Sequence, residues 1–183
     1  MDVTLRTAGR ADEPVLWRML FEAAHAADDG IAGPDGLRSI PELARYVEDW
    51  GRPSDLGVIA LSADGEPIGA AWCRLFTAGR PGYAYIDDDT PELAIAVADD
   101  RRGHGVGRLM LDRLLDDAHG RFTRLCLSVR ADNPARRLYE AVGFGVVDGS
   151  AIPNRGGGTS ITMTRVLTWP DVGQCPDPPT SLR

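Results

Sequence analysis

A change of hydrophobic spacing in the middle of residues 93–119 constrains the fold of this chain more than any other feature. Residues 93–97 place bulky apolar side chains at every second position, which is the period of a β-strand. Residues 105–119 then carry an apolar stripe at helical spacing, made of Val106, Leu109, Met110 and Leu114. Between them lies the glycine-rich segment Arg102-Gly103-His104-Gly105-Val106-Gly107. The pattern predicts a strand, a tight turn and a helix that ends near Gly120.

The same two periods recur along the rest of the chain. Alternating apolar residues predict further strands at residues 3–7, 57–61, 68–76, 125–129, 144–147 and 160–166. Helical spacing and capping residues predict helices at residues 11–27, at residues 41–50 with Ser39 or a neighbour as cap, and from Asn133-Pro134 to about Gly143. The pair Asp64-Gly65 predicts a hairpin turn, and residues 77–91 a loop.

These elements give a fold class. Their order is β-α-α-β-β-β-α-β-α-β-β, which predicts a single α/β domain around a mixed sheet, with α+β character. We expect this domain to cover residues 1–167. Residues 168–183 are rich in proline and lack periodicity, so we expect an irregular tail there.

Composition excludes several classes of function. With 43% hydrophobic and 26% charged residues, the chain is expected to be globular. All 20 basic residues are arginine and the net charge is −7, which argues against nucleic-acid binding because such domains usually carry a basic surface. The sequence shows no membrane span and no secretory signal, so we expect a cytoplasmic protein with no membrane partner. Cys73, Cys126 and Cys175 lack metal-ligand spacing, so no metal is expected.

The glycine turn has the features of a phosphate site. The first amides of a helix have no internal acceptor and lie at the positive end of the helix dipole, and glycine allows an anion to approach the backbone. A dinucleotide fingerprint would need a third glycine or alanine where the chain has Arg108 or Met110. The phosphate loop of nucleotide hydrolases would need a lysine, and the chain has none. The turn therefore favours a pyrophosphate ligand outside these two nucleotide-binding classes.

Three segments in order resemble the GNAT superfamily of acyl-CoA-dependent N-acetyltransferases. Residues 92–97 (ELAIAV) resemble its central strand, and Arg102-x-x-Gly105-x-Gly107 matches its pyrophosphate signature. Residues 133–144 (NPARRLYEAVGF) resemble its later block. Asp99 departs from the family, which often has proline there. The resemblance implies a GNAT-like domain that uses acetyl-CoA as co-substrate.

The resemblance also implies roles for individual residues. Ile95 and Val97 would bind the pantetheine arm through their main chains. The pyrophosphate would be held at Arg102, Gly103, His104, Gly105, Val106, Gly107 and Arg108 through backbone amides, which leaves the side chain of His104 in solvent. Asn133 would cap its helix and contact the cofactor. Tyr139 would protonate the departing CoA thiolate.

An acceptor amine must lose a proton before it attacks a thioester. Glu92, at the head of the central strand, is the first candidate base, with Asp87, Asp88, Asp89 or a water relay as alternatives. This acidic group also predicts an acceptor that is a cation before it reacts. The cysteines have no histidine close in sequence, which favours direct attack in a ternary complex over an acyl-enzyme.

The acceptor is expected to be a primary amine on a small molecule or on a protein or peptide. We place its site between Trp17, Phe21 and His25, the loop at residues 77–91 and the final hairpin. The alternative is a non-catalytic acyl-CoA-binding or regulatory module that keeps the turn and lacks a working acid and base. Homodimers are frequent among proteins of this type, so the resemblance also allows a homodimer.

Overall fold

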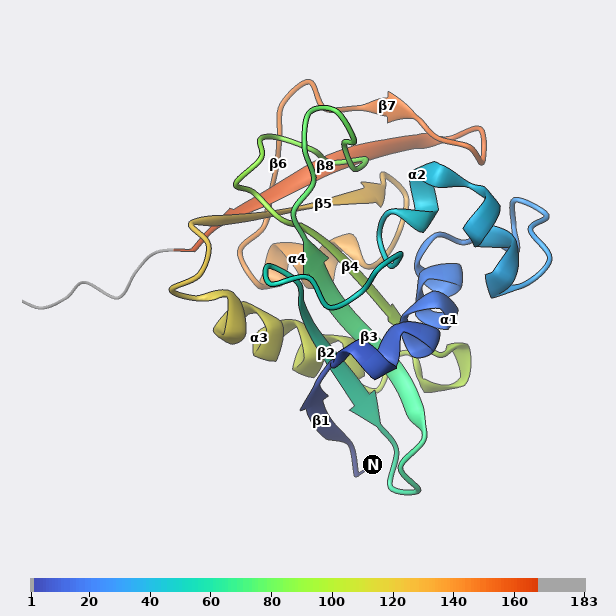
Figure 1. Cartoon of the computed structure of the whole chain (residues 1–183). Coiled ribbons are helices and arrows are strands. Elements are labelled where there is room, and N and C mark those ends of the chain that lie inside the picture. Colours follow the sequence, from blue (N-terminus) through green and yellow to red (C-terminus); the bar gives the residue numbers. More distant parts are fainter. Residues whose placement is uncertain (1, 168–183) are drawn as a thin grey trace, which may run out of the picture.

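The computed structural model describes residues 2–167, which form an eight-stranded sheet with helices on both faces (Figure 1). The strands are β1 (Thr4–Thr7), β2 (Leu56–Leu61), β3 (Pro67–Arg74), β4 (Glu92–Val97), β5 (Arg124–Arg130), β6 (Gly145–Val146), β7 (Ile152–Pro153) and β8 (Thr159–Val166). The helices are α1 (Glu13–Ala23), α2 (Pro41–Ala44), α3 (Val106–Ala118) and α4 (Arg136–Ala141). Short 3-10 turns lie at Arg10–Asp12, Pro34–Ser39 and Asp99–Arg101. The α/β fold with a mixed sheet is confirmed.

Alternation along the central strands divides the apolar residues between two cores. Val58 and Ala60 pack with α3 on one face of the sheet, whereas Ile59 between them packs with α1 and the residues around α2 on the other. On β4, Leu93, Ile95 and Val97 belong to the α3 side, and Ala94 and Ala96 to the α1 side. Odd-numbered side chains on β4 therefore face the α3 side and even-numbered ones face the α1 side.

The sheet is open between β4 and β5. Its strand order is β1-β2-β3-β4-β5-β8-β6, and β7 pairs with β8. The β3–β4 ladder is antiparallel and continues along the whole of β4, but the parallel β4–β5 pair is joined only at Glu92 and Cys126. Beyond that point the two strands separate, so the second half of β4 has a free edge toward β5.

Backbone direction shows which groups line this free edge. The amide of Ala98 donates to the carbonyl of Ile68 on the β3 side at 2.9 Å. Because successive residues of a strand point their backbone groups to opposite sides, the amides and carbonyls of Ile95 and Val97 face the opening. These are the two main chains that the sequence predicts as partners of a cofactor arm.

Several expected boundaries were wrong. The helix expected at residues 11–27 ends at Ala23, since His25 has a φ of +52°, which a right-handed helix cannot contain. The helix expected at residues 41–50 is regular only over Pro41–Ala44, and its N-cap is Ile40. The Ser39 hydroxyl instead donates to the carbonyl of Gly36 at 2.8 Å.

Two further details differ near the end of the chain. Regular helix α4 begins at Arg136, after a turn in which the Asn133 side chain accepts the amide of Ala135 at 2.8 Å. Asn133 therefore caps this turn and not the helix itself. Strand β7 was not predicted, because two residues that include a proline show no alternation. The tail expected at residues 168–183 lies outside the described residues.

Candidate active site

A cavity of about 1010 Å³ occupies the opening between β4 and β5. It is lined by most of the residues that the sequence singles out: Glu92, Ile95, Val97, Arg102, Gly103, Gly105, Val106, Gly107, Arg108, Asn133 and Tyr139. These residues come from β4, the glycine turn, the first turn of α3, the β5–α4 loop and α4. His104 does not line the cavity: it is exposed, and its Nδ1 lies 2.8 Å from the carbonyl oxygen of Arg102.

The glycine turn presents free amides to the cavity. Gly103 and Gly105 have φ values of +76° and +81°, a left-handed conformation that favours glycine. Gly105 is the N-cap of α3, so the amides of Val106, Gly107 and Arg108 have no acceptor within the helix. A Cβ placed on Gly103 or Gly105 would meet no atom within 4 Å, which shows that the space in front of the turn is open. The turn can therefore accept an anion at its backbone.

The two arginines beside the turn are already paired. Arg102 donates to the carbonyl of Val97 at 3.1 Å and pairs with Asp99 at 2.6 Å and with Glu22 at 3.4 Å. Arg108 donates to Asp112 one helical turn later, at 2.7 Å. Backbone amides, and not unpaired guanidinium groups, are thus the free donors of the turn.

Glu92 is buried at the narrow end of the opening. The residue is 2% exposed, and because it shares the alternate positions of β4 with Ala94 and Ala96, its side chain lies on the α1 side of the sheet. The Tyr46 hydroxyl donates to Glu92 Oε1 at 2.6 Å, and the amide of Ala84 donates to Oε2 at 3.0 Å. Burial raises the pKa of Glu92 to about 7, while the two hydrogen bonds act in the opposite direction. Near neutral pH this carboxyl can therefore both accept and release a proton.

Tyr139 lines the same cavity from the other face of the sheet. Its ring packs in the α3-side core and lies edge-on to Phe144, with ring centroids 6.2 Å apart. Burial raises the pKa of its hydroxyl to about 12, and no hydrogen bond from residues 2–167 contributes to that shift. The hydroxyl keeps its proton at neutral pH. Glu92 and Tyr139 thus approach the opening from opposite faces.

The acidic loop residues do not reach the cavity. Asp87, Asp88 and Asp89 are exposed and are absent from its lining. Asp88 accepts hydrogen bonds from the amide of Ala78 and the hydroxyl of Tyr85, and Asp87 lies 3.9 Å from Arg124. Of the four acidic residues that the sequence offers as a base, Glu92 is therefore the one that lines the cavity.

The expected acceptor residues are only partly in place. His25 lines the cavity, and its Nε2 lies 3.3 Å from Asn133 Nδ2. Trp17 and Phe21 instead pack in the α1-side core, and Trp17 donates to Glu13 at 3.0 Å. Tyr83 is the member of the loop at residues 77–91 that lines the cavity.

Sequence reasoning missed several residues that line the cavity. Tyr46, which binds Glu92, lies 46 positions away from it in the chain, so no local spacing could connect the two. Charged residues that line the same cavity were also missed, among them Asp28, Asp29, Arg130 and Arg155. These four come from three separate segments and meet only in the folded chain.

Two of the three cysteines, Cys73 and Cys126, lie within the described residues. Cys73 and Cys126 are buried and free, and burial raises the pKa of Cys73 to about 12, so neither is suited to be a thiolate nucleophile. Cys175 lies outside the described residues. Within residues 2–167, no group of three or more metal-ligating side chains is gathered, and no helix is both long and apolar enough to cross a membrane.

Comparison with known proteins identifies the family. A family model described as "Acetyltransferase (GNAT) family" matches residues 19–144. The chain belongs to this family. It is therefore an acetyltransferase, as the order of its three motifs suggested.

Individual GNAT relatives are more distant. A segment of 68 residues is 44% identical to N-alpha-acetyltransferase 40 of Saccharomyces cerevisiae, and covers 32% of this chain but only 24% of that relative. A GCN5-related N-acetyltransferase from Kribbella flavida matches with a TM-score of 0.63 at 24% identity, over 90% of this chain and 98% of its own. The ribosomal-protein-S18-alanine N-acetyltransferase of Escherichia coli matches with a TM-score of 0.64 at 21% identity, over 95% and 99%. At these identities the two structures support the GNAT fold alone.

Proposed function

We propose that this GNAT protein transfers an acetyl group from acetyl-CoA to a primary amine by direct attack within a ternary complex. One observation carries the proposal: the β4–β5 opening has a carboxyl on one face and a phenol on the other, with free helix amides at its wide end. An amine bound in this opening could lose its proton to the Glu92 carboxyl on one face, and the sulfur of the thioester could gain one from the Tyr139 phenol on the other.

The lining of the cavity supports acetyl-CoA as the proposed co-substrate. On the free edge of β4, the amide and carbonyl of Ile95 and the amide of Val97 could bond the amides of an extended pantetheine arm. The amides of residues 103–108 offer an anion site for the pyrophosphate. When bound, acetyl-CoA would supply an activated acetyl group. The protein would hold it, orient it and move protons at two named atoms.

Glu92 is proposed to accept the proton that the acceptor amine must lose. A base works best when its pKa lies near the working pH, and burial brings the pKa of Glu92 to about 7. Tyr139 is proposed to donate its proton to the CoA sulfur. Its raised pKa, about 12, keeps it protonated until that step. Because Cys73 and Cys126 are buried in the described structure, an acyl-cysteine intermediate has no support.

The acceptor is proposed to be an amine on a small molecule or at a protein or peptide N-terminus. Support comes from the names of two relatives, one an N-alpha-acetyltransferase and one a ribosomal-protein-alanine N-acetyltransferase. The charged residues Asp28, Asp29, Arg130 and Arg155 line the α1 side of the cavity, where Glu92 also lies, and would contact the acceptor.

The test is acetyl-CoA consumption across a library of small amines and peptides, compared between the wild-type protein and Glu92→Gln. We expect turnover with at least one primary amine and a loss of roughly 10² to 10⁴ in rate for the variant. Calorimetry should show that both proteins bind acetyl-CoA equally. Binding of CoA without turnover on any amine would contradict the proposal and favour the non-catalytic module.

A further inference from the structure

We propose that Tyr46 is a positioning residue, which orients the Glu92 carboxylate and stabilises its ionised form for proton transfer. The inference rests on the proposed role of Glu92 as base. It assigns a new function to a tyrosine that lies outside the three motifs of the sequence and comes from the turn after α2.

Hydrogen-bond directions fix where the Tyr46 proton points. A phenol has one proton to donate and can also accept. The amide of Tyr83 donates to the Tyr46 oxygen at 2.8 Å, so that oxygen serves there as an acceptor. The hydroxyl proton is therefore directed at Glu92 Oε1, 2.6 Å away. A donor held toward one carboxylate oxygen favours the ionised carboxylate over the neutral acid.

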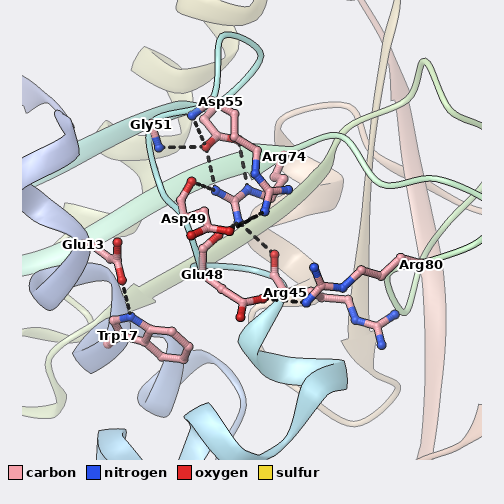
Figure 2. A network of polar contacts seen from close by, with 10 residues as sticks. Glu13, Trp17, Arg45, Glu48, Asp49, Gly51, Asp55, Arg74 and Arg80 are labelled. Carbon is pink, nitrogen blue, oxygen red and sulfur yellow. Dashed lines mark hydrogen bonds and ion pairs between the residues drawn. The ribbon is translucent and has the colours of Figure 1, made fainter.

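The strand beside β4 holds Tyr46 in place. Trp72 on β3 donates its indole N–H to the carbonyl of Tyr46 at 3.1 Å. Arg74, also on β3, donates to the carbonyls of Arg45 and Glu48 at 2.9 and 2.7 Å (Figure 2). These two residues flank Tyr46 in the sequence. Arg74 is itself the register partner of Glu92. The two strands thus fix both partners of the Tyr46–Glu92 bond.

The loop completes the arrangement from the other side. The Ala84 amide donates to Glu92 Oε2, so each carboxylate oxygen receives one donor. A Cβ on Gly82 would overlap Glu92 Oε2, which explains why the loop can approach the carboxylate only with a glycine there. The Tyr46 ring also lies edge-on to Phe76, with centroids 4.9 Å apart.

Two arginines, a tyrosine and a cysteine are the other ionisable groups around Glu92. Arg74 on β3 is paired with Asp55, and the charge of Arg45 after α2 lowers the pKa of Glu92. Burial raises the pKa of Tyr83 in the loop and that of Cys126 on β5, so both stay protonated. Glu92 is therefore the group in this cluster that titrates.

Loss of the Tyr46 hydroxyl should move that titration in a known direction. Burial raises the pKa of Glu92 to about 7, and the bond from Tyr46 is the leading factor that lowers it. Tyr46→Phe removes the bond, so the pKa should rise further. Since Glu92 must be ionised to act as a base, the acidic limb of the rate profile should move to higher pH.

The experiment compares Tyr46→Phe with Tyr85→Phe as a matched control. Tyr85 lies in the same loop as Tyr83 and also donates to a carboxylate, Asp88, but it does not line the cavity. In Tyr46→Phe the acidic limb of kcat/KM should move up by about one pH unit, the worth of a hydrogen bond to a charged group. Tyr85→Phe should leave the limb in place. Deprotonation of the acceptor's own ammonium also shapes the pH profile, but it is the same for every variant. A difference between variants therefore reports on the protein.

A uniform loss of activity at every pH would overturn the proposal, because it would show that Tyr46 is merely structural. A ¹³C NMR titration of glutamate carboxyls, with Glu92→Gln to assign the signal, gives a readout that needs no turnover. An unchanged Glu92 pKa in folded Tyr46→Phe would also overturn the proposal. If the pKa of Glu92 shifts in Tyr46→Phe but the acidic limb of kcat/KM does not move, Glu92 is not the base. Tyr46 would then have no role in catalysis, and the proposal would be overturned. If no amine is acetylated at all, the proposed function fails, while the titration still decides whether Tyr46 controls Glu92.

Discussion

Two groups of polar atoms in this protein differ in how much of their hydrogen-bonding capacity the chain itself uses. The first is the Arg74 cluster, in which Arg74 and Asp55 are 1% and 2% exposed (Figure 2). Arg74 makes five hydrogen bonds, two to Asp55 and three to the carbonyls of Arg45, Glu48 and Asp49. A guanidinium has five N–H donors, so none is left over.

The second group lines the cavity and is left partly unbonded. The amides of residues 106–108 have no acceptor within α3. Burial alone raises the pKa of the Tyr139 hydroxyl, with no contribution from a hydrogen bond within residues 2–167. Asp29 lies 3.4 Å from Arg155 and 3.7 Å from Arg130, yet Asp29 Oδ2 is buried without a hydrogen-bond partner. These polar groups can bind a further molecule, which the Arg74 cluster cannot do.

This difference in hydrogen bonding separates residues that stabilise the fold from residues that can take part in binding and catalysis. A buried charge is stable in the fold only when its partners satisfy it, and breaking such a pair is costly. The Arg74 cluster should therefore affect stability and, through Tyr46, the orientation of Glu92. The cavity groups should affect binding and rate with little effect on stability. Replacements on either side can test this division.

The largest effect is expected at Tyr139. Tyr139→Phe removes one hydroxyl and keeps the ring that packs near Phe144. If Tyr139 protonates the CoA sulfur, the single-turnover rate should fall by roughly 10² to 10⁴, the usual contribution of a positioned general acid. Affinity for acetyl-CoA should barely change, because the lost interaction belongs to the transition state. A single-turnover assay is needed, since slow product release could hide the effect.

Tyr139→Phe should also keep the free energy of unfolding close to that of the wild-type protein, as expected for a cavity group. A rate within about threefold of wild type, less than the tenfold that 1.36 kcal/mol represents, would remove Tyr139 from the mechanism. A variant that folds as stably as wild type but has a slow chemical step would show that Tyr139 affects rate and not stability, the opposite of what is expected for Arg74.

The next effect concerns Arg74. Arg74→Met should lower the free energy of unfolding by about 3–5 kcal/mol, because Asp55 would remain buried without its partner. Arg80→Met is the control: Arg80 pairs with Glu48 at 2.6 Å, but both side chains are about half exposed. An exposed pair of this kind should contribute no more than about 1 kcal/mol. Urea unfolding of the two variants without acetyl-CoA gives the comparison. Equal stabilities would show that burial does not distinguish the two pairs.

Local patterns were sufficient to predict the parts of the site that are contiguous in sequence. The strand at residues 92–97, the glycine turn and α3 follow one another, so periodicity and turn residues revealed them. Distant partners could not be predicted in this way. Arg74 and Asp55 lie 19 residues apart and Tyr46 and Glu92 lie 46 apart, and no spacing rule connects them. The family resemblance supplied Tyr139, which helix periodicity alone would have described as a packed aromatic.

Overestimated helices have a related cause. Apolar spacing continues past Ala23 and Ala44, but the chain turns there to bring other segments to the cavity. His25, two residues beyond α1, adopts a positive φ and lines the cavity. Its side chain also lies 3.3 Å from that of Asn133, more than a hundred residues away in the chain. Apolar spacing alone therefore does not show where these helices end.

The smallest of the three effects concerns the anion site at the glycine turn. Gly105→Asp would place a negative side chain in the open space where the pyrophosphate is proposed to bind. Gly65→Asp is a matched control, since both glycines have a φ of +81° and neither Cβ would meet an atom within 4 Å. Both variants should thus have a similar backbone cost, about 1–2 kcal/mol of stability. Calorimetry should show acetyl-CoA affinity at least about tenfold lower, or roughly 1.4 kcal/mol, only in Gly105→Asp. Because the backbone strain is matched, an equal loss in both variants would indicate a stability effect, and unchanged affinity in folded Gly105→Asp would place the cofactor elsewhere.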